Sequence, residues 1–161
     1  MNIKKAIKSL IPKKYCFFVT HLYTSLSFQA FVRTVFSGNG EDILLNEYLF
    51  KNKNKGFYVD VGCFHPKHIS NTHLLYKRGW SGINIDPNPN SISLFNFYRS
   101  RDINLNLGVA PEEKELTYYN FAEAGINTFD KDHADNKNSK EWSTLISEDK
   151  VMCYRLDTIL D

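Results

Sequence analysis

Residues 57–86 read FYVDVGCFHPKHISNTHLLYKRGWSGINID, and this stretch decides the fold class. It contains two short runs rich in β-branched and aromatic residues, Phe57–Val61 and Ile83–Asp86, which predict two strands. Between them Thr72–Arg78 has helical spacing, and a second helix is predicted from Ser91 onward. Because strands that alternate with helices form parallel sheets with right-handed crossovers, this order predicts the parallel βαβ core of an α/β fold.

Capping residues set the predicted ends of the helices. The hydroxyl groups of Ser70 and Ser91 are suited to cap two helix N-termini, and Gly79 supplies a C-terminal stop. An earlier helix is predicted to begin at Glu41 and Asp42, because acidic side chains in the first turn favour a helix start.

The sequence after the second helix predicts an antiparallel addition to this core. Residues 103–109 alternate apolar and polar side chains, and 116–121 follows across a charged turn, so the two are expected to pair as a hairpin. Residues 130–150 are polar, which is typical of a solvated helix or loop, and 151–156 predicts a last strand. An open α/β sheet usually has about five strands or more, with helices on both faces. We therefore expect 37–161 to be a partial domain, incomplete at its C-terminus.

Length and composition indicate one ordinary globular domain. The chain has 161 residues, of which 42% are hydrophobic and 24% charged. Residues 1–36 form a basic, aromatic arm with six basic and no acidic side chains, whereas the rest carries 14 basic and 18 acidic ones. A mildly acidic body argues against a nucleic-acid partner. The three cysteines form no Cys-x-x-Cys pair, which favours a reducing, cytoplasmic location.

The N-terminal arm lacks the features of a spanning or secreted segment. Its longest uninterrupted apolar run is Tyr15–Val19, and a spanning helix needs about 18 apolar residues or more. We expect the arm to pack on the domain or to extend loosely from it. The alternative is weak contact of residues 1–36 with the inner face of a membrane, since basic and aromatic residues favour an anionic lipid surface.

The ends of the two predicted strands carry the candidate ligand-binding residues. In α/β sheets, ligands bind at the carboxyl ends of the strands. Gly62 allows the backbone to approach a ligand, and Asp86, 24 residues later, is placed to accept both hydroxyl hydrogens of a ribose. A dinucleotide needs Gly-x-Gly-x-x-Gly for its pyrophosphate, whereas the loop after Gly62 has no further glycine. These residues therefore favour S-adenosylmethionine over NAD.

Plainer interpretations exist for the same residues. Asp60 could cap backbone N–H groups of the following loop, and Asp86 could be a turn former before Pro87. The histidines and the cysteine within residues 63–73 straddle a proline-containing loop without a paired cysteine, so no metal site is predicted.

Several motifs, taken in order, resemble the FkbM-type S-adenosylmethionine-dependent methyltransferases. They are Asn39–Asp42, Phe57–Gly62, Ser70–Thr72, Leu74-Leu75 with Gly79–Gly82, Ile83–Pro89, Asn106, the turn at 110–115 and Asn127–Phe129. The resemblance covers about residues 37–161. It implies a Rossmann-like class I methyltransferase sheet, S-adenosylmethionine as cofactor, and methyl transfer to a hydroxyl of a glycan-related or small-molecule acceptor.

The resemblance also implies roles for individual residues. Asp86 would hold the ribose with Asn88 beside it, and His65 is the local candidate for the base that takes the acceptor's hydroxyl proton. The other cofactor-binding candidates lie on the first strand, on its loop, at the next helix start and on the upstream helix: Asp60, Gly62, Phe64, Ser70, Asn71, Thr72, Glu41 and Asp42.

Two other functions stay open at this point. The family continues after a segment like Tyr154–Asp161 into an acidic Asp-x-Glu-Gly motif that this sequence lacks. A truncated, non-catalytic binding or assembly module of the same fold is therefore the main alternative. An enzyme that uses NAD or a nucleotide sugar is a weaker one.

Overall fold

The computed structural model describes residues 34–140 and 143–161. The chain divides into two units after Thr34, and Val35–Asp161 is the unit considered below. The predicted N-terminal arm lies almost wholly outside the described residues, so its membrane contact stays a prediction. Within the described ranges, no helix combines the length and the apolar character needed to cross a bilayer.

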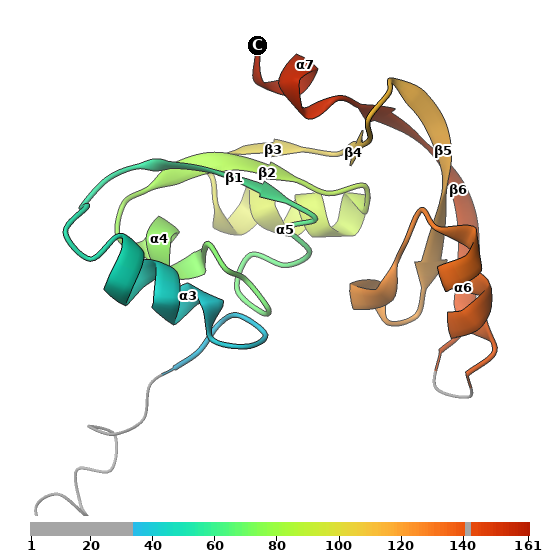
Figure 1. The fold of residues 1–161 in the computed structure, drawn as a ribbon, viewed down its shortest axis with the longest axis horizontal. Helices are drawn as coiled ribbons and strands as arrows, with labels where there is room; N and C mark the ends of the chain where they lie inside the picture. The colour runs from blue at the N-terminus through green and yellow to red at the C-terminus, as the bar shows by residue number, and fades with distance from the viewer. Residues whose placement is uncertain (1–33, 141–142) are drawn as a thin grey trace, which may run out of the picture. The chain divides into compact units, whose positions relative to one another are not determined.

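A three-stranded parallel sheet carries the predicted ligand-binding strands (Figure 1). Its strands are β1 (Phe57–Val61), β2 (Ser81–Ile85) and β3 (Ile103–Leu105), in the order β1-β2-β3. β2 is parallel to both neighbours. The parallel core predicted from residues 57–86 is therefore confirmed.

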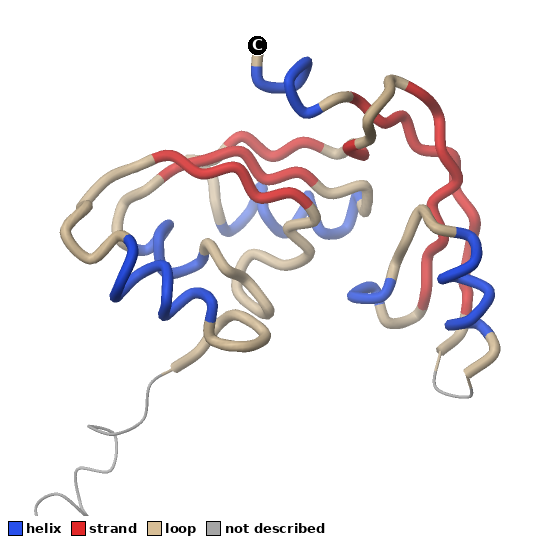
Figure 2. Tube along the Cα trace, in the orientation of Figure 1, coloured by secondary structure: helices blue, strands red, loops and turns tan. Residues whose placement is uncertain are grey.

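Two helices cover one face of this sheet, as Figures 1 and 2 show. They are α4 (His73–Lys77) and α5 (Pro89–Tyr98). Tyr58 of β1 packs against α4, and the side chain of Asn104, which lies next to the end of α5, donates a hydrogen bond to that helix. The strands follow one another across the sheet in one direction, so right-handed crossovers place both helices on the same side.

The opposite face of the sheet, which we call the open face, is apolar, and it is exposed along the edge strands β1 and β3, whereas Ile83 and Ile85 of β2 are buried. Successive side chains of a strand point to opposite faces, so the residues on either side of Tyr58 lie on the open face. Phe57, Val59 and Val61 of β1 and Ile103 of β3 are between 38% and 58% exposed. Parallel sheets of α/β proteins normally bury both faces. The open face is thus a surface suited to being covered.

A second sheet has the order β4-β6-β5. Its central strand is β6 (Leu145–Tyr154), with β4 (Gly108–Val109) parallel on one side and β5 (Lys114–Phe121) antiparallel on the other. Residues 145–150, predicted as solvated helix or loop, belong to β6. Because β5 supplies backbone partners for all of this segment except Ile146, its polar composition does not prevent strand formation.

The hairpin predicted between residues 103–109 and 116–121 is wrong. β3 joins the parallel sheet, whereas β4 and β5 both pair with β6. The alternating run is interrupted at Asn106, whose side-chain amide donates to the carbonyl oxygens of Asp86 and Pro87 at 3.0 and 2.9 Å. This anchor separates one predicted strand into two short ones.

The predicted helix caps also need correction. Asn88 caps α5, since its Oδ1 accepts the N–H of Asn90 at 3.0 Å, and Ser91 lies inside the helix. Ser70 does not cap α4, because its hydroxyl accepts a hydrogen bond from Arg99 instead. The stop predicted at Gly79 is confirmed by its φ of 94°.

Five further elements complete the described part of the chain. They are α3 (Glu41–Leu44), the π-helical turn η2 (Leu45–Leu49), the 3-10 turn η3 (Ala124–Ile126), α6 (Lys131–Asn138) and α7 (Leu156–Leu160). The helix start predicted at Glu41 is confirmed. The last predicted strand, 151–156, is the end of β6 and stops at Tyr154.

Candidate functional site

The carboxyl ends of β1 and β2 meet at a glycine turn. Gly62 donates its N–H to the carbonyl oxygen of Ile85 at 2.8 Å, and Cys63 donates to the same oxygen at 3.2 Å. The φ of Gly62 is 73°, and a Cβ atom built there would meet no atom within 4 Å. Backbone conformation rather than crowding therefore requires glycine at this turn.

Asp86 lies against this turn. Its Oδ2 accepts the N–H of Phe64 at 2.8 Å, and its Oδ1 accepts the N–H of Asn88 at 2.8 Å. Burial raises the pKa of Asp86, and these two N–H groups lower it in part. Each carboxylate oxygen has two lone pairs, so these bonds leave one lone pair on each oxygen unused, on a side chain that is 6% exposed. The structure thus brings together the two residues expected to share a ribose-containing ligand.

The loop after the glycine turn contains strained backbone. Phe64 and Ile69 have φ values of 54° and 52°, which residues other than glycine rarely adopt. Such strain persists only where surrounding contacts impose it, and it clusters at functional sites. The hydrogen bond from the Phe64 N–H to Asp86 is one of those contacts.

Asp60 occupies the end of β1 on the helix-covered face. Its carboxylate accepts the hydroxyl of Thr72 at 2.7 Å. Burial raises the pKa of Asp60. Thr72 Oγ1 in turn accepts from Arg99 Nη1 at 2.7 Å, so the carboxylate is joined to a buried cation through one hydroxyl.

Arg99 organises the loop and is the residue that sequence reasoning missed. Its side chain is 1% exposed. Nε and Nη2 donate to the carbonyl oxygen of Pro66 at 3.1 and 2.6 Å, and Nη2 also donates to Ser70 Oγ at 2.7 Å. Among the ion pairs of the described residues none includes Arg99. Uncharged oxygen atoms accept the hydrogen bonds of the guanidinium group, and these bonds fix the loop between β1 and α4.

A second branch of the Arg99 hydrogen-bond network reaches β2. Arg99 Nη1 donates to the Tyr58 hydroxyl at 3.4 Å, and that hydroxyl donates to Asp102 Oδ2. Asp102 Oδ1 accepts the N–H of Gly82 in β2 at 3.0 Å. Arg99 is therefore linked through hydroxyl groups to one carboxylate on each branch.

His65 holds its own loop. Its Nδ1 accepts the N–H groups of Lys67 and His68, each at 3.0 Å. Burial lowers the pKa of His65, which favours the neutral ring with its hydrogen on Nε2. To take a proton, Nδ1 would have to release both backbone groups. The base role of His65 stays a prediction, and the hydrogen bonds give the ring a structural role.

The two candidate residues upstream, Glu41 and Asp42, form hydrogen bonds with residues 36–39 of their own segment. Asp42 is fully buried and accepts the N–H of Phe36 at 2.9 Å and the hydroxyl of Ser37 at 2.6 Å. Backbone hydrogen bonds at Glu41 itself and at Asn39 lower the pKa of Glu41 to about 2. Glu41 is half-buried, whereas Asp42 is fully buried, so any ligand contact by this pair would fall to Glu41.

The other predicted residues are close to the turn in different ways. Ser70 and Thr72 accept hydrogen bonds from Arg99, and Phe64 contributes its backbone N–H. Asn88 caps α5 next to Asp86, whereas Asn71 is exposed between its two network neighbours.

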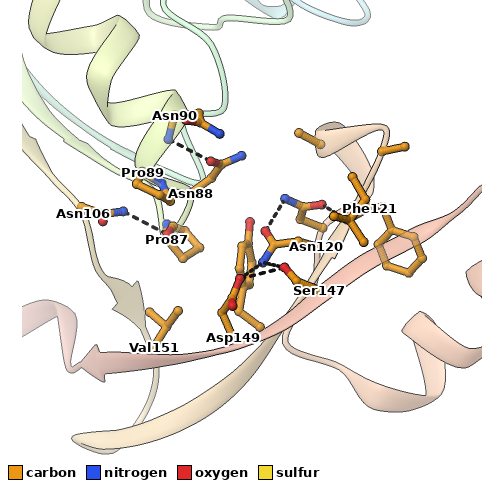
Figure 3. A pocket seen from close by; sticks show the side chains of 15 residues that line it. Pro87, Asn88, Pro89, Asn90, Asn106, Asn120, Phe121, Ser147, Asp149 and Val151 are labelled. Atoms are coloured by element: carbon orange, nitrogen blue, oxygen red, sulfur yellow. Dashed lines mark hydrogen bonds between the residues drawn. The ribbon is translucent and has the colours of Figure 1, made fainter.

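A cavity of about 520 Å³ begins at Pro87, directly after Asp86 (Figure 3). One wall comes from the ends of β2 and β3, and the other from β5, β6 and the loop after β5. Its lining is rich in side-chain amides: Asn88, Asn90, Asn106, Asn120 and Asn127. Its volume is in the range of small-molecule sites, about 300–1,000 Å³.

Comparison with protein families adds an independent observation. A family model described as the methyltransferase FkbM domain matches residues 54–161, a span that includes the glycine turn, Asp86 and both sheets. The chain belongs to the FkbM methyltransferase family. No curated protein and no solved structure matches it. Membership of the FkbM family supports a methyltransferase function in general and implies a class I methyltransferase fold, and the parallel sheet agrees with that fold.

Asp60→Asn is expected to raise the melting temperature at neutral pH by about 2–5 °C. The folded chain raises the pKa of Asp60, so folding becomes less favourable as the pH rises through the range in which the buried carboxyl ionises. An amide removes that charge and keeps an oxygen for Thr72. Position 60 is also in register with Asn84, whose buried Oδ1 has no partner within the described residues and could accept a hydrogen bond from the new NH₂ group.

Thermal melts followed by circular dichroism between about pH 4 and pH 8 test this expectation. The gain should shrink as the pH falls toward the ordinary carboxyl pKa, about 3.9. The matched control is Asp132→Asn, which changes an exposed carboxyl of α6 and should show no such pH dependence. Equal melting temperatures of the parent chain and Asp60→Asn at neutral pH would refute the argument.

Proposed function

We propose that this chain binds S-adenosylmethionine and transfers its methyl group to a hydroxyl of a glycan-related or small-molecule acceptor. The observation that carries the proposal is the position of the Asp86 carboxylate beside the Gly62 turn, at the ends of two adjacent parallel strands. Membership of the FkbM family supports the reaction class.

The groups around the turn fit this cofactor. Asp86 keeps one acceptor position on each oxygen, which matches the two hydroxyls of a ribose. Asp60 and Asp86 make the strand ends acidic, which suits a cofactor that carries a sulfonium and an ammonium group. A pyrophosphate would need further glycines that let backbone N–H groups approach it, and the loop after Gly62 has none.

The reaction asks mainly for positioning. When bound, S-adenosylmethionine supplies an electrophilic methyl group at its sulfonium centre. Asp86 would orient the ribose, and the Arg99 network would keep the loop between β1 and α4 in one conformation. A base is needed only to take the acceptor's hydroxyl proton, for which His65 remains the candidate.

A second candidate function is a non-catalytic binding or assembly module of the same fold. The open face favours it, because exposed apolar side chains that stand together mark interaction surfaces. The two functions differ in whether methyl groups leave the cofactor.

Isothermal titration calorimetry of the full chain tests the cofactor proposal. We expect heat of binding with S-adenosylmethionine and with S-adenosylhomocysteine, and none with NAD. A folded chain that binds neither sulfur compound would refute the proposal, and binding of NAD alone would favour the dinucleotide alternative. Binding without release of methyl groups to any hydroxylated acceptor would favour the binding module.

A further inference from the structure

We propose that the second-sheet wall of the cavity binds a neutral, polyhydroxylated acceptor, and that Asp149 accepts a hydrogen bond from one of its hydroxyl groups. This inference rests on the proposed function, because it assigns the acceptor to the cavity next to the cofactor-binding residues.

Four side chains form a hydrogen-bonded group on this wall, which we call the wall cluster (Figure 3). Its members are Asn120 of β5, Asn127 of the following loop, and Ser147 and Asp149 of β6. Asn127 Nδ2 donates to Asn120 Oδ1 at 3.1 Å, and Asn120 Nδ2 donates to Asp149 Oδ2 at 2.6 Å. Ser147 Oγ donates to the same carboxylate oxygen at 2.9 Å.

The donors of the wall cluster all point in one direction. The N–H of Phe121 donates to Asn127 Oδ1 at 2.8 Å, which fixes the orientation of that amide and, through it, that of Asn120. The chain of bonds ends on Oδ2 of Asp149. The other carboxylate oxygen, Oδ1, accepts no hydrogen bond from residues 34–140 and 143–161. The carboxylate of the exposed residue Asp149, held in place by this series of hydrogen bonds, therefore has an oxygen that can accept another one.

The chemistry of the lining selects the class of ligand. Asp149 is the sole charged residue among those that line the cavity, which include no lysine, arginine or histidine. A phosphate or carboxylate would be repelled by Asp149 and would find no cation. Hydroxyl groups both donate and accept, so they can pair with the carboxylate and with the amides. The rings of Pro87 and Tyr118 supply apolar surface for the C–H groups of a sugar ring.

The position of the cavity suits an acceptor. It begins at Pro87 and Asn88, directly after the carboxylate proposed to hold the ribose. Asn106, which follows β3, donates a hydrogen bond to the Pro87 carbonyl oxygen, and this bond holds the two residues of this cavity wall together. A volume of about 520 Å³ accommodates a molecule of monosaccharide size beside the cofactor.

The test is nuclear magnetic resonance of the ¹⁵N-labelled full chain with neutral sugars. D-Glucose, D-mannose and L-rhamnose are the probes, and glucose 6-phosphate is the anionic counterpart. We expect at least one neutral sugar to shift the side-chain amide signals of Asn120 and Asn127, with a smaller shift for the phosphate. Asp149→Asn should weaken the binding of that sugar at least about tenfold, as for loss of a charged hydrogen bond.

The outcomes separate this inference from the proposed function. S-Adenosylhomocysteine should shift the backbone signals of Gly62 and Phe64, and its affinity should be the same in Asp149→Asn and in the control Asp132→Asn. Failure of that shift would count against the proposed function. The acceptor inference is overturned if no neutral sugar shifts the Asn120 and Asn127 signals, if Asp149→Asn binds the sugar as tightly as the parent chain, or if S-adenosylhomocysteine competes with the sugar.

Discussion

Arg99→Ala is expected to lower the free energy of unfolding by about 3–5 kcal/mol. The substitution leaves the Pro66 carbonyl oxygen and the Ser70 and Thr72 hydroxyls without their buried donor, and each unsatisfied buried group costs about 1–3 kcal/mol. It also opens a void beside the ring of Phe95, which lies 4.9 Å from the guanidinium carbon.

Urea unfolding followed by far-ultraviolet circular dichroism measures this loss. Arg101→Ala is the matched control, because Arg101 lies on the surface, where it donates to the Tyr76 carbonyl oxygen and stacks on the Tyr76 ring. Its removal should cost about 1 kcal/mol or less. Arg99→Lys keeps the charge without the planar fork and should also destabilise the chain. Similar stabilities of Arg99→Ala and Arg101→Ala would contradict the role given to the buried network.

Asp86→Asn is expected to weaken the binding of S-adenosylhomocysteine by about 100-fold or more. The amide keeps one oxygen, but its NH₂ group faces either the N–H of Phe64 or that of Asn88, both of which are donors. One acceptor position for the ribose is lost together with the negative charge. A site built to pair with hydroxyl groups loses about 1.5–3 kcal/mol for each hydrogen bond to a charged group.

Calorimetric titration of the parent chain and of Asp86→Asn gives the two dissociation constants. Circular dichroism at the same temperature shows whether the variant is folded, and Asp132→Asn again serves as the control for a surface carboxyl. If the parent chain and Asp86→Asn bound S-adenosylhomocysteine with equal affinity, the proposed contact of Asp86 with the ribose would be excluded. This outcome does not depend on which ligand the cavity binds.

The parallel core could be predicted because its signals are local. The strand at 57–61, the strand at 83–86 and the glycine stop at 79 each depend on neighbouring residues, and right-handed crossover then fixes their arrangement. The same topology brings Asp86 to Gly62, since the carboxyl ends of adjacent parallel strands share one edge. The main part of the candidate site therefore follows from sequence order.

Strand partners and the buried network could not be predicted, because both depend on long-range contacts. Alternation at 103–109 identifies extended chain but not its partner, and the bonds of Asn106 to a loop about 20 residues earlier divide that run. Arg99 follows a helix, where an arginine ordinarily points into solvent. Its partners lie between 27 and 41 residues earlier, and no local pattern announces them. Asp149 could not be predicted for the same reason, because it lies in a charged stretch that forms a strand by pairing with β5.

The open face determines which changes this chain tolerates and what they alter. Its exposed side chains lie on the edge strands β1 and β3, so replacing Ile103, which is 54% exposed, with threonine removes little burial and should leave the cooperativity of unfolding intact. Such a replacement changes the tendency of the chain to associate. Fully burying an exposed apolar side chain gains about 1.5–3 kcal/mol, and because these side chains are 38–58% exposed, covering them gains about half of that. Sulfate, which strengthens that gain, should lower the solubility of the chain, and polar substitutions on this one face should restore it.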